Sequence, residues 1–190
     1  PDEDVETAGT KIKSLAYRTK KLFEIICDHR LIISTPLGYQ LNPELNIMTD
    51  TQQFEEYWFK AQNALTLQTK IELLKKATEL YRGNLFDTAS FEHWLMPHEL
   101  AFKYMCLGIY IELMRIYYEV QDYTSVQFYA SLALKIEKAC VDAFYWLIRA
   151  MQQKDSSSMA KAELKIAKQV LSDEEYAELL QKLKNRNLDI

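Results

Sequence analysis

The sequence predicts a mainly α-helical protein built from helical repeats, with one β-hairpin near its N-terminus. Apolar residues recur at three- and four-residue spacing through nearly all of the chain after Asp50, which is typical of amphipathic helices. Only four glycines and four prolines occur among the 190 residues, so little long loop is expected. The stretch ISTPLGYQL, Ile33–Leu41, differs because branched and aromatic residues surround a proline and a glycine, a pattern typical of a hairpin.

The composition is that of a soluble protein with a core, since 48% of the residues are hydrophobic and 26% are charged. A net charge of -4 gives no general attraction to nucleic acid or to anionic membranes, so such binding needs a local basic patch. No apolar run reaches the length of a membrane span, and the start, PDEDVETAG, is acidic where a signal peptide is basic. We therefore expect a cytoplasmic protein with no membrane partner, whose chain begins in a loop partway through a domain.

No catalytic, cofactor or metal site is expected. The four glycines form no phosphate-binding loop, and His29, His93 and His98 lack the spacing of metal ligands. Paired acids such as Glu55 and Glu56 or Glu174 and Glu175 fall at helix starts or on polar faces, where the helix dipole explains them. Three widely spaced cysteines, at positions 27, 106 and 140, indicate buried free thiols in a reducing compartment. The sequence therefore predicts a protein that is not an enzyme.

The segment Thr10–Ile26 is predicted to form an amphipathic helix with one apolar and one basic face. Its apolar stripe comprises Ile12, Leu15, Leu22 and Ile26, widened by Ala16 and Phe23. Its other side carries Lys13, Ser14, Tyr17, Lys20 and Lys21, with Arg18 on the flank. Between Thr10 and Thr35 there are six Lys or Arg against two acids. Such a basic face is either simply exposed to solvent or binds an anion. A two-stranded hairpin must pack on a neighbouring element. The hairpin that follows this helix therefore favours anion binding.

After a short connector the sequence predicts helices to its end. Asp50 or Thr51 begins one that runs to about Leu67, and Thr69 begins another that ends at Gly83. A loop with Asp87 and Ser90 follows. The remaining helices are expected at about 91–97, from there to 119, and at 123–138, 141–154, 158–171 and 173–186.

Part of this helical region repeats at a shift of 34 positions. The shift pairs Tyr110 with Phe144, Leu113 with Leu147, Tyr117 with Met151, Val126 with Ala160, Ala130 with Leu164, Ala133 with Ala167 and Ile136 with Val170. This period predicts helix-turn-helix repeats of the tetratricopeptide class, in which each pair buries its apolar face by stacking on the next.

The many aromatic side chains either form the core or line a ligand groove, and their helical spacing favours the core. Tyr117 with Tyr118, and Phe144 with Tyr145, place rings on adjoining helix faces. Some of these rings are therefore expected to be exposed, where they would mark a partner surface.

The stretch IKSLAYRTKKLFEIICDHRLIISTPLGYQL, residues 12–41, resembles the end of a winged helix-turn-helix domain of the response-regulator output type. The matching residues are Tyr17, Arg18, Lys20, Lys21 and Leu22 in the helix, then Ile33, Thr35, Gly38, Tyr39 and Leu41 in the hairpin. The resemblance implies a recognition helix followed by a two-stranded wing, with the preceding helices of that domain lying before Pro1. The wing tip carries Pro36 and Leu37, so it lacks a basic residue for the minor groove.

The segments TDTQQFEEYW, ATELYRGNLF and FEHWLMPHEL resemble, in order, the bacterial transcriptional activator domain of antibiotic-regulatory-protein regulators. The counterparts are Asp50, Phe54, Ala77, Tyr81, Gly83, Leu85, Trp94 and Leu100. Together the two resemblances imply residues 1–48 as the C-terminal part of the DNA-binding domain and residues 49–190 as a tetratricopeptide-like activator domain.

These expectations describe a bacterial, cytoplasmic transcription regulator, activating in type, that binds promoter DNA and contacts RNA polymerase or another copy of itself. Lys13, Ser14 and Tyr17 are expected to face the major groove, with Arg18, Lys20, Lys21 and Arg30 nearer the phosphates. The alternative is a helical-repeat scaffold that binds a protein or peptide and no DNA. Residues 49–190 favour that alternative slightly, because they carry 17 basic and 20 acidic side chains.

Overall fold

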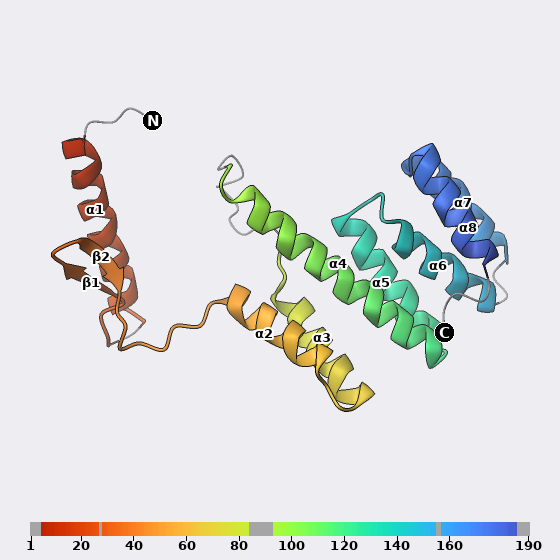
Figure 1. Ribbon diagram of the computed structural model, residues 1–190, viewed down its shortest axis with the longest axis horizontal. Helices are drawn as coiled ribbons and strands as arrows, with labels where there is room; N and C mark the ends of the chain where they lie inside the picture. Colours follow the sequence, from red (N-terminus) through yellow and green to blue (C-terminus); the bar gives the residue numbers. More distant parts are fainter. Residues whose placement is uncertain (1–4, 27, 84–92, 155–156, 186–190) are drawn as a thin grey trace. The chain divides into compact units, whose positions relative to one another are not determined.

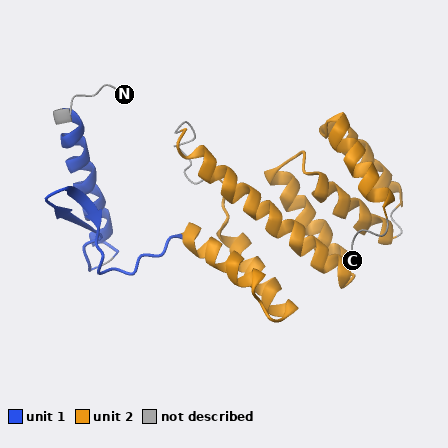
Figure 2. Cartoon of the chain, in the orientation of Figure 1, with its two compact units in different colours: residues 1–49 blue, residues 50–190 orange. Residues whose placement is uncertain are grey.

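A computed structural model describes residues 5–26, 28–83, 93–154 and 157–185 of the chain (Figure 1). This part is mainly helical, with eight helices and one two-stranded antiparallel sheet. The chain divides into two compact units, residues 1–49 and 50–190 (Figure 2). Unit 1 holds the sheet and one helix, and unit 2 holds the other seven described helices.

Unit 1 consists of α1 (Val5–Glu24) and a hairpin formed by β1 (Ile32–Thr35) and β2 (Gly38–Leu41). The strands pair antiparallel, so the predicted hairpin is confirmed. A two-residue turn that begins with Pro36 joins them, and Gly38 after it has φ +133°. Residues with a side chain rarely adopt this backbone conformation, which explains a glycine at the start of the second strand.

The helix α1 begins at Val5, five residues before the predicted start, so the expectation of a loop through Gly9 is wrong for Val5–Gly9. One glycine in a helix costs only about 1 kcal/mol, so Gly9 does not prevent the helix from beginning at Val5. The helix also ends at Glu24 rather than Ile26, where the Ile26 amide donates to the carbonyl of Phe23 in a turn (N···O 3.0 Å).

The hairpin lies beside α1 (Figure 1) but leaves most of the apolar stripe uncovered. Ala16 is the one buried side chain among the described residues of unit 1. The stripe residues remain exposed: Ile12 by 54%, Leu15 by 61%, Leu22 by 64% and Ile26 by 79%. Unit 1 therefore contains little core of its own.

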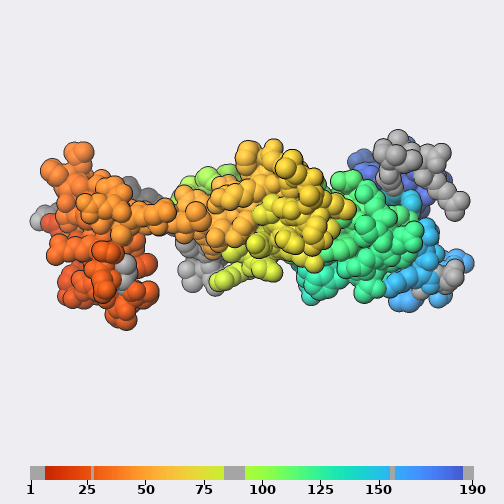
Figure 3. All heavy atoms as spheres, turned by 90° about the horizontal axis from the view of Figure 1, so that it is seen from below, coloured from red at the N-terminus to blue at the C-terminus, as the bar shows by residue number. Residues whose placement is uncertain are grey.

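Unit 2 is a run of helices that pack mainly on their neighbours in the chain. They are α2 (Asp50–Gln62), α3 (Leu67–Leu80), α4 (Met96–Glu119), α5 (Tyr123–Ile136), α6 (Val141–Gln153), α7 (Ser157–Val170) and α8 (Asp173–Lys184). Figure 3 shows them following one another in chain order through the unit. Helices that are not consecutive in the chain also make contact, because α6 packs against α4 and against α8.

The boundary between α2 and α3 differs from the prediction. The first helix ends at Gln62 instead of about Leu67, and the second is capped by Thr66 instead of Thr69. The Thr66 hydroxyl accepts a hydrogen bond from the Thr69 amide (3.1 Å), and the Asn63 side chain donates to the carbonyl of Phe59 (2.9 Å). These side-chain bonds to the backbone end one helix and begin the next without a glycine or proline.

The connection from α3 to α4 also departs from the prediction. The helix α3 ends at Leu80, and Gly83 follows with φ +111° instead of closing the last turn. The sequence predicts that Pro97 ends a helix at 91–97, but it lies in the first turn of α4. Proline is tolerated there because the amides of the first turn have no hydrogen-bond partner within the helix. The expected loop residues Asp87 and Ser90, the start of the 91–97 helix and the counterpart Leu85 lie outside the described residues.

The later helices match the predicted ranges to within two residues, which is the usual uncertainty of helix ends, although Arg186 lies outside the described residues. Their bounds also recur at the 34-residue shift. The helix α5, Tyr123–Ile136, is followed 34 positions later by α7, Ser157–Val170, and the end of α4 at Glu119 corresponds to the end of α6 at Gln153. The second helices of two consecutive pairs, α5 and α7, thus have the same length of 14 residues and begin at the same distance after the helix before them, whereas α4 is longer than α6 at its N-terminal end.

The core of unit 2 contains most of the residues that the 34-residue shift pairs. Both members are buried in four of these pairs: Tyr110 with Phe144, Leu113 with Leu147, Val126 with Ala160, and Ala133 with Ala167. Val170 is an exception because it is 41% exposed at the end of α7. The 34-residue shift therefore relates mostly buried positions to one another. This correspondence is lost at the C-terminal end of α7.

Ala133→Leu and Ala167→Leu should each lower the free energy of unfolding of unit 2 by about 1–3 kcal/mol, because three added carbon atoms overpack a fully buried position. Chemical denaturation followed by circular dichroism measures this. Ala162→Leu, at an exposed position of α7, is the control and should leave stability nearly unchanged. If neither buried substitution alters the midpoint, the proposed repeat register is wrong.

Of the rings that the sequence predicted to be exposed in part, Tyr117 and Tyr118 are partly exposed, but Phe144 and Tyr145 are not. Phe144 and Tyr145 are both buried, because α6 is covered on several sides by α4, α5, α7 and α8. Tyr117 stacks on a neighbouring ring of α5, and Tyr118 packs beside Trp146. Among the described residues of unit 2, the most exposed rings are Phe59, Trp94, Tyr104 and Phe128.

Two of the three cysteines fall in the described residues, and Cys27 lies outside them. Cys106 is a buried free thiol in α4, and Cys140 is a half-buried one before α6. Burial raises the pKa of Cys106 to about 12, so this thiol stays protonated.

Candidate nucleic-acid interface

The basic face of α1 is open to solvent. Of the side chains expected to contact DNA, Lys13, Ser14, Tyr17, Arg18, Lys21 and Arg30 are exposed and Lys20 is partly exposed. Helical spacing puts Lys13, Tyr17 and Lys20 on one side of α1, with Lys21 beside them and Arg18 further round. Arg30 follows α1 in the loop before the hairpin.

Four of these predicted residues meet at one surface hollow. Tyr17, Lys20, Lys21 and Arg30, together with Glu24, line an open hollow of about 310 Å³. Three positive charges thus border a single concavity, where an anionic group could approach all of them. Lys13, Ser14 and Arg18 lie outside it, along the same helix.

Contacts with the hairpin hold Lys20 in this position. Its ammonium lies 3.4 Å from the hydroxyl of Ser34 in β1 and 5.5 Å from the ring centroid of Tyr39 in β2. The second contact is a cation–π interaction, which is worth about 0.5–1 kcal/mol at an exposed site. The hairpin therefore orients a basic side chain of α1, although it buries little of that helix.

The hollow also contains an acid that would compete with a bound anion. Lys21 forms an ion pair with Glu24, with 2.8 Å between Nζ and Oε2. This hydrogen bond lowers the pKa of Glu24 and raises that of Lys21, so both groups stay charged near neutral pH. Arg30 likewise borders a second hollow, of about 460 Å³, that contains Asp28 and Glu44. Binding of phosphate here requires the Lys21–Glu24 ion pair to loosen.

Sequence reasoning missed three contributors to this surface. Glu24 was counted only as part of the local charge, whereas it pairs directly with Lys21. Ser34 and Tyr39 contact Lys20 only because the hairpin folds back beside α1. The spacing of three and four residues could have indicated the Lys21–Glu24 pair, but the contact of Lys20 with Tyr39 depends on the tertiary structure.

The other classes of site have less support in the structure. Within the described ranges, no three or more His, Cys, Asp or Glu side chains are grouped so as to hold a metal ion. None of the described helices combines the length and the apolar character needed to cross a membrane. No family model, curated protein or solved structure matches this chain.

Proposed function

We propose that this protein is a bacterial, cytoplasmic, non-enzymatic transcription regulator, activating in type, that binds promoter DNA through unit 1. In this proposal α1 is the recognition helix of a partial winged helix, and the hairpin is its wing. Unit 2 is then a tetratricopeptide-like domain of the bacterial transcriptional activator type, which serves regulation, self-association or contact with RNA polymerase.

One observation carries the proposal: Tyr17, Lys20, Lys21 and Arg30 converge on one open hollow in a protein that is acidic overall. Such a basic cluster attracts a negatively charged phosphate group. Contacts between basic side chains and phosphates set the orientation of a helix on DNA. Lys13, Ser14 and Tyr17 on the same helix have the donors and acceptors that read base edges in the major groove. Ser34 and Tyr39 support the arrangement by fixing Lys20.

The proposal for unit 2 is supported by its helix bounds. The bounds of α5 and α7 recur at 34 residues, as do the ends of α4 and α6, and most of the buried positions recur with them. That period is characteristic of tetratricopeptide repeats. Stacked repeats bury a continuous core and leave helix faces free for partners.

The test is a gel-shift titration of the complete protein against DNA upstream of its gene, at about 0.05 to 0.3 M salt. Binding through phosphates should weaken steeply as salt rises, because each contact releases counterions. A scrambled duplex of equal length measures the sequence-independent part. Absence of salt-sensitive binding at the lowest salt contradicts the proposal.

The alternative is a helical-repeat scaffold that binds a protein or peptide and no DNA. It is favoured by the exposed rings of unit 2, Phe59, Trp94, Tyr104 and Phe128, because exposed aromatic side chains are common at protein interfaces. The excess of acids in residues 49–190 also suits a role without nucleic acid. The same gel-shift titration decides between the two, since a scaffold leaves the mobility of the duplex unchanged.

A further inference from the structure

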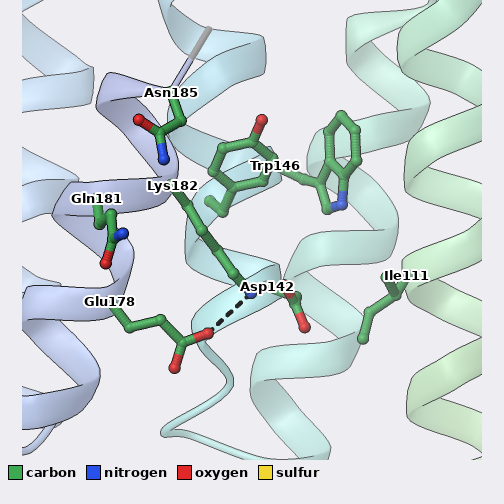
Figure 4. A pocket seen from close by; sticks show the side chains of 8 residues that line it. Ile111, Asp142, Trp146, Glu178, Gln181, Lys182 and Asn185 are labelled. Atoms are coloured by element: carbon green, nitrogen blue, oxygen red, sulfur yellow. Dashed lines mark hydrogen bonds and ion pairs between the residues drawn. The ribbon is translucent and has the colours of Figure 1, made fainter. Parts of the chain in front are cut away.

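A cavity of unit 2 lies where α4, α6 and α8 meet. It has a volume of about 460 Å³. That volume is in the range of sites for small molecules. Its lining residues are Ile111 from α4, Asp142, Tyr145 and Trp146 from α6, and Glu178, Gln181 and Lys182 from α8, with Asn185 just after it. Figure 4 shows polar groups of α8 facing the ring of Trp146 and the side chain of Ile111.

The charged groups of the cavity carry a net negative charge. The Lys182 ammonium lies 2.6 Å from Asp142 Oδ1 and 2.9 Å from Glu178 Oε1, so one cation is shared by two carboxylates (Figure 4). Burial lowers the pKa of Lys182, but its hydrogen bonds to Asp142 and Glu178 outweigh this and raise the pKa overall. The ammonium therefore stays charged, and one negative charge of the cluster remains without a counterion in the cavity.

The α8 side of the cavity is rich in hydrogen-bond acceptors. Glu178, Gln181, Lys182 and Asn185 follow a spacing of three and four residues, so they share one face of the helix and its end. Lys182 contacts one oxygen of each carboxylate, Oδ1 of Asp142 and Oε1 of Glu178. The amide carbonyls of Gln181 and Asn185 add two further acceptors. An ammonium or guanidinium group can donate to several of these oxygens at once.

The opposite wall is aromatic and apolar. Trp146 and Tyr145 are 94% and 95% buried, and Trp146 packs on Tyr118 with ring centroids 5.2 Å apart. Rings of α4 and α6 near this wall already hold one cation, because the Arg149 guanidinium lies 5.1 Å from the ring centroid of Tyr118 in α4 and 5.6 Å from that of Tyr145 in α6. Arg149 is not part of the cavity lining. An aromatic wall facing excess carboxylate is the combination that binds organic cations.

We infer that this cavity binds a small organic cation: an ammonium or guanidinium group carried on an apolar body. The cation binds carboxylate oxygens of Asp142 and Glu178 beside the Lys182 ammonium, and the body packs on Trp146 and Ile111. An anionic ligand is disfavoured because the one cation of the lining already serves two carboxylates. The inference does not depend on DNA binding by unit 1, since every lining residue belongs to unit 2.

The probe for the test is 4-phenylbutylamine, and the controls are 4-phenylbutanol and 4-phenylbutyrate, which keep the body and replace the cation by a neutral or anionic group. Calorimetric titration of the whole chain should give an affinity for the amine at least about tenfold above that for the alcohol, with the acid weaker still. In ¹⁵N-labelled protein the indole N–H signal of Trp146, assigned with Trp146→Phe, should shift with the amine. The signal of exposed Trp94 should not.

Three variants separate the roles of the charges. The double variant Asp142→Asn with Glu178→Gln should lower affinity for the amine about tenfold and leave that for the alcohol unchanged. Lys182→Gln should raise affinity for the amine several-fold, because it removes the competing ammonium; this gain cannot result from misfolding. Glu174→Gln, at an exposed position in the first turn of α8, is the control. Equal binding of amine and alcohol, or no gain with Lys182→Gln, overturns the inference.

Discussion

Replacing Arg18, Lys20 and Lys21 by glutamine should weaken DNA binding by a factor on the order of 10² to 10³ at about 0.1 M salt. Each phosphate contact contributes about 0.9 to the slope of log affinity against log salt, or roughly eightfold between 1 M and 0.1 M salt. Three lost contacts should therefore reduce the slope by about three. Gel-shift titrations of the complete protein over a salt series measure both quantities.

The substitutions should change thermal stability little. The Lys21–Glu24 ion pair is exposed, with both side chains more than half accessible, and such pairs contribute about 0–1 kcal/mol. The control variant replaces Lys135, Lys138 and Lys165, which are exposed on unit 2, and so removes the same total charge. If the slope is unchanged in the first variant, or falls equally in the control, α1 is not the DNA-binding element.

Sequence periodicity located the helices well because each buried face comes from residues three and four apart. The pattern placed α5, α6, α7 and α8 to within two residues. The errors arose where a side chain bonds to the backbone, as Thr66 does at the start of α3, since glycine and proline are absent there. Such caps depend on one hydroxyl in the right conformation, and many threonines that do not cap look the same in sequence.

The candidate basic surface was also visible in part from sequence alone. Charge counting found the cluster of Lys20, Lys21 and Arg30, and the structure brings these three to one hollow. Charge counting could not find the contact of Lys20 with Tyr39, because this contact joins a helix to a strand and its two residues are 19 positions apart. The cavity around Trp146 was missed for the same reason, because its lining comes from three separate helices.

The misplacement of exposed rings has a related cause. Adjoining rings such as Phe144 and Tyr145 cannot both face one neighbouring helix, so the sequence suggested that one is exposed. The helix α6 contacts α4, α5, α7 and α8 and so buries nearly its whole circumference. A helix covered on all sides shows little one-sided pattern, and its sequence alone does not reveal how many neighbours it has.

The last prediction concerns hydrogen exchange, which should separate the two units by orders of magnitude. The amides of α1 and of the hairpin should exchange within about tenfold of unstructured rates, whereas those of α4 to α6 should be protected at least about 10³-fold. Unit 1 buries one described side chain, Ala16. Most helical stability in proteins comes from tertiary packing, and an isolated hairpin is at best marginally stable in water. Unit 2 has an extensive apolar core.

The apolar stripe of α1 is the reason for this difference. Burying a side chain such as Leu15 or Leu22 is worth about 1.5–3 kcal/mol, and both are more than half exposed. Without that contribution, little beyond the helix itself opposes local unfolding. Basic side chains on a fraying helix keep their charge but lose their fixed direction, so binding by this chain should be sensitive to salt and nearly blind to sequence.

A variant in each unit tests whether the units unfold independently. Leu113→Ala removes a fully buried side chain from α4 and should destabilise unit 2 by about 2–5 kcal/mol. Protection in α4 to α6 should fall accordingly, while exchange in α1 stays as fast as before. Leu15→Ala, at an exposed position of α1, is the matched change and should leave unit 2 unaffected. Protection of α1 amides above about 10³-fold in dilute free protein contradicts the prediction, because it requires the stripe to be covered.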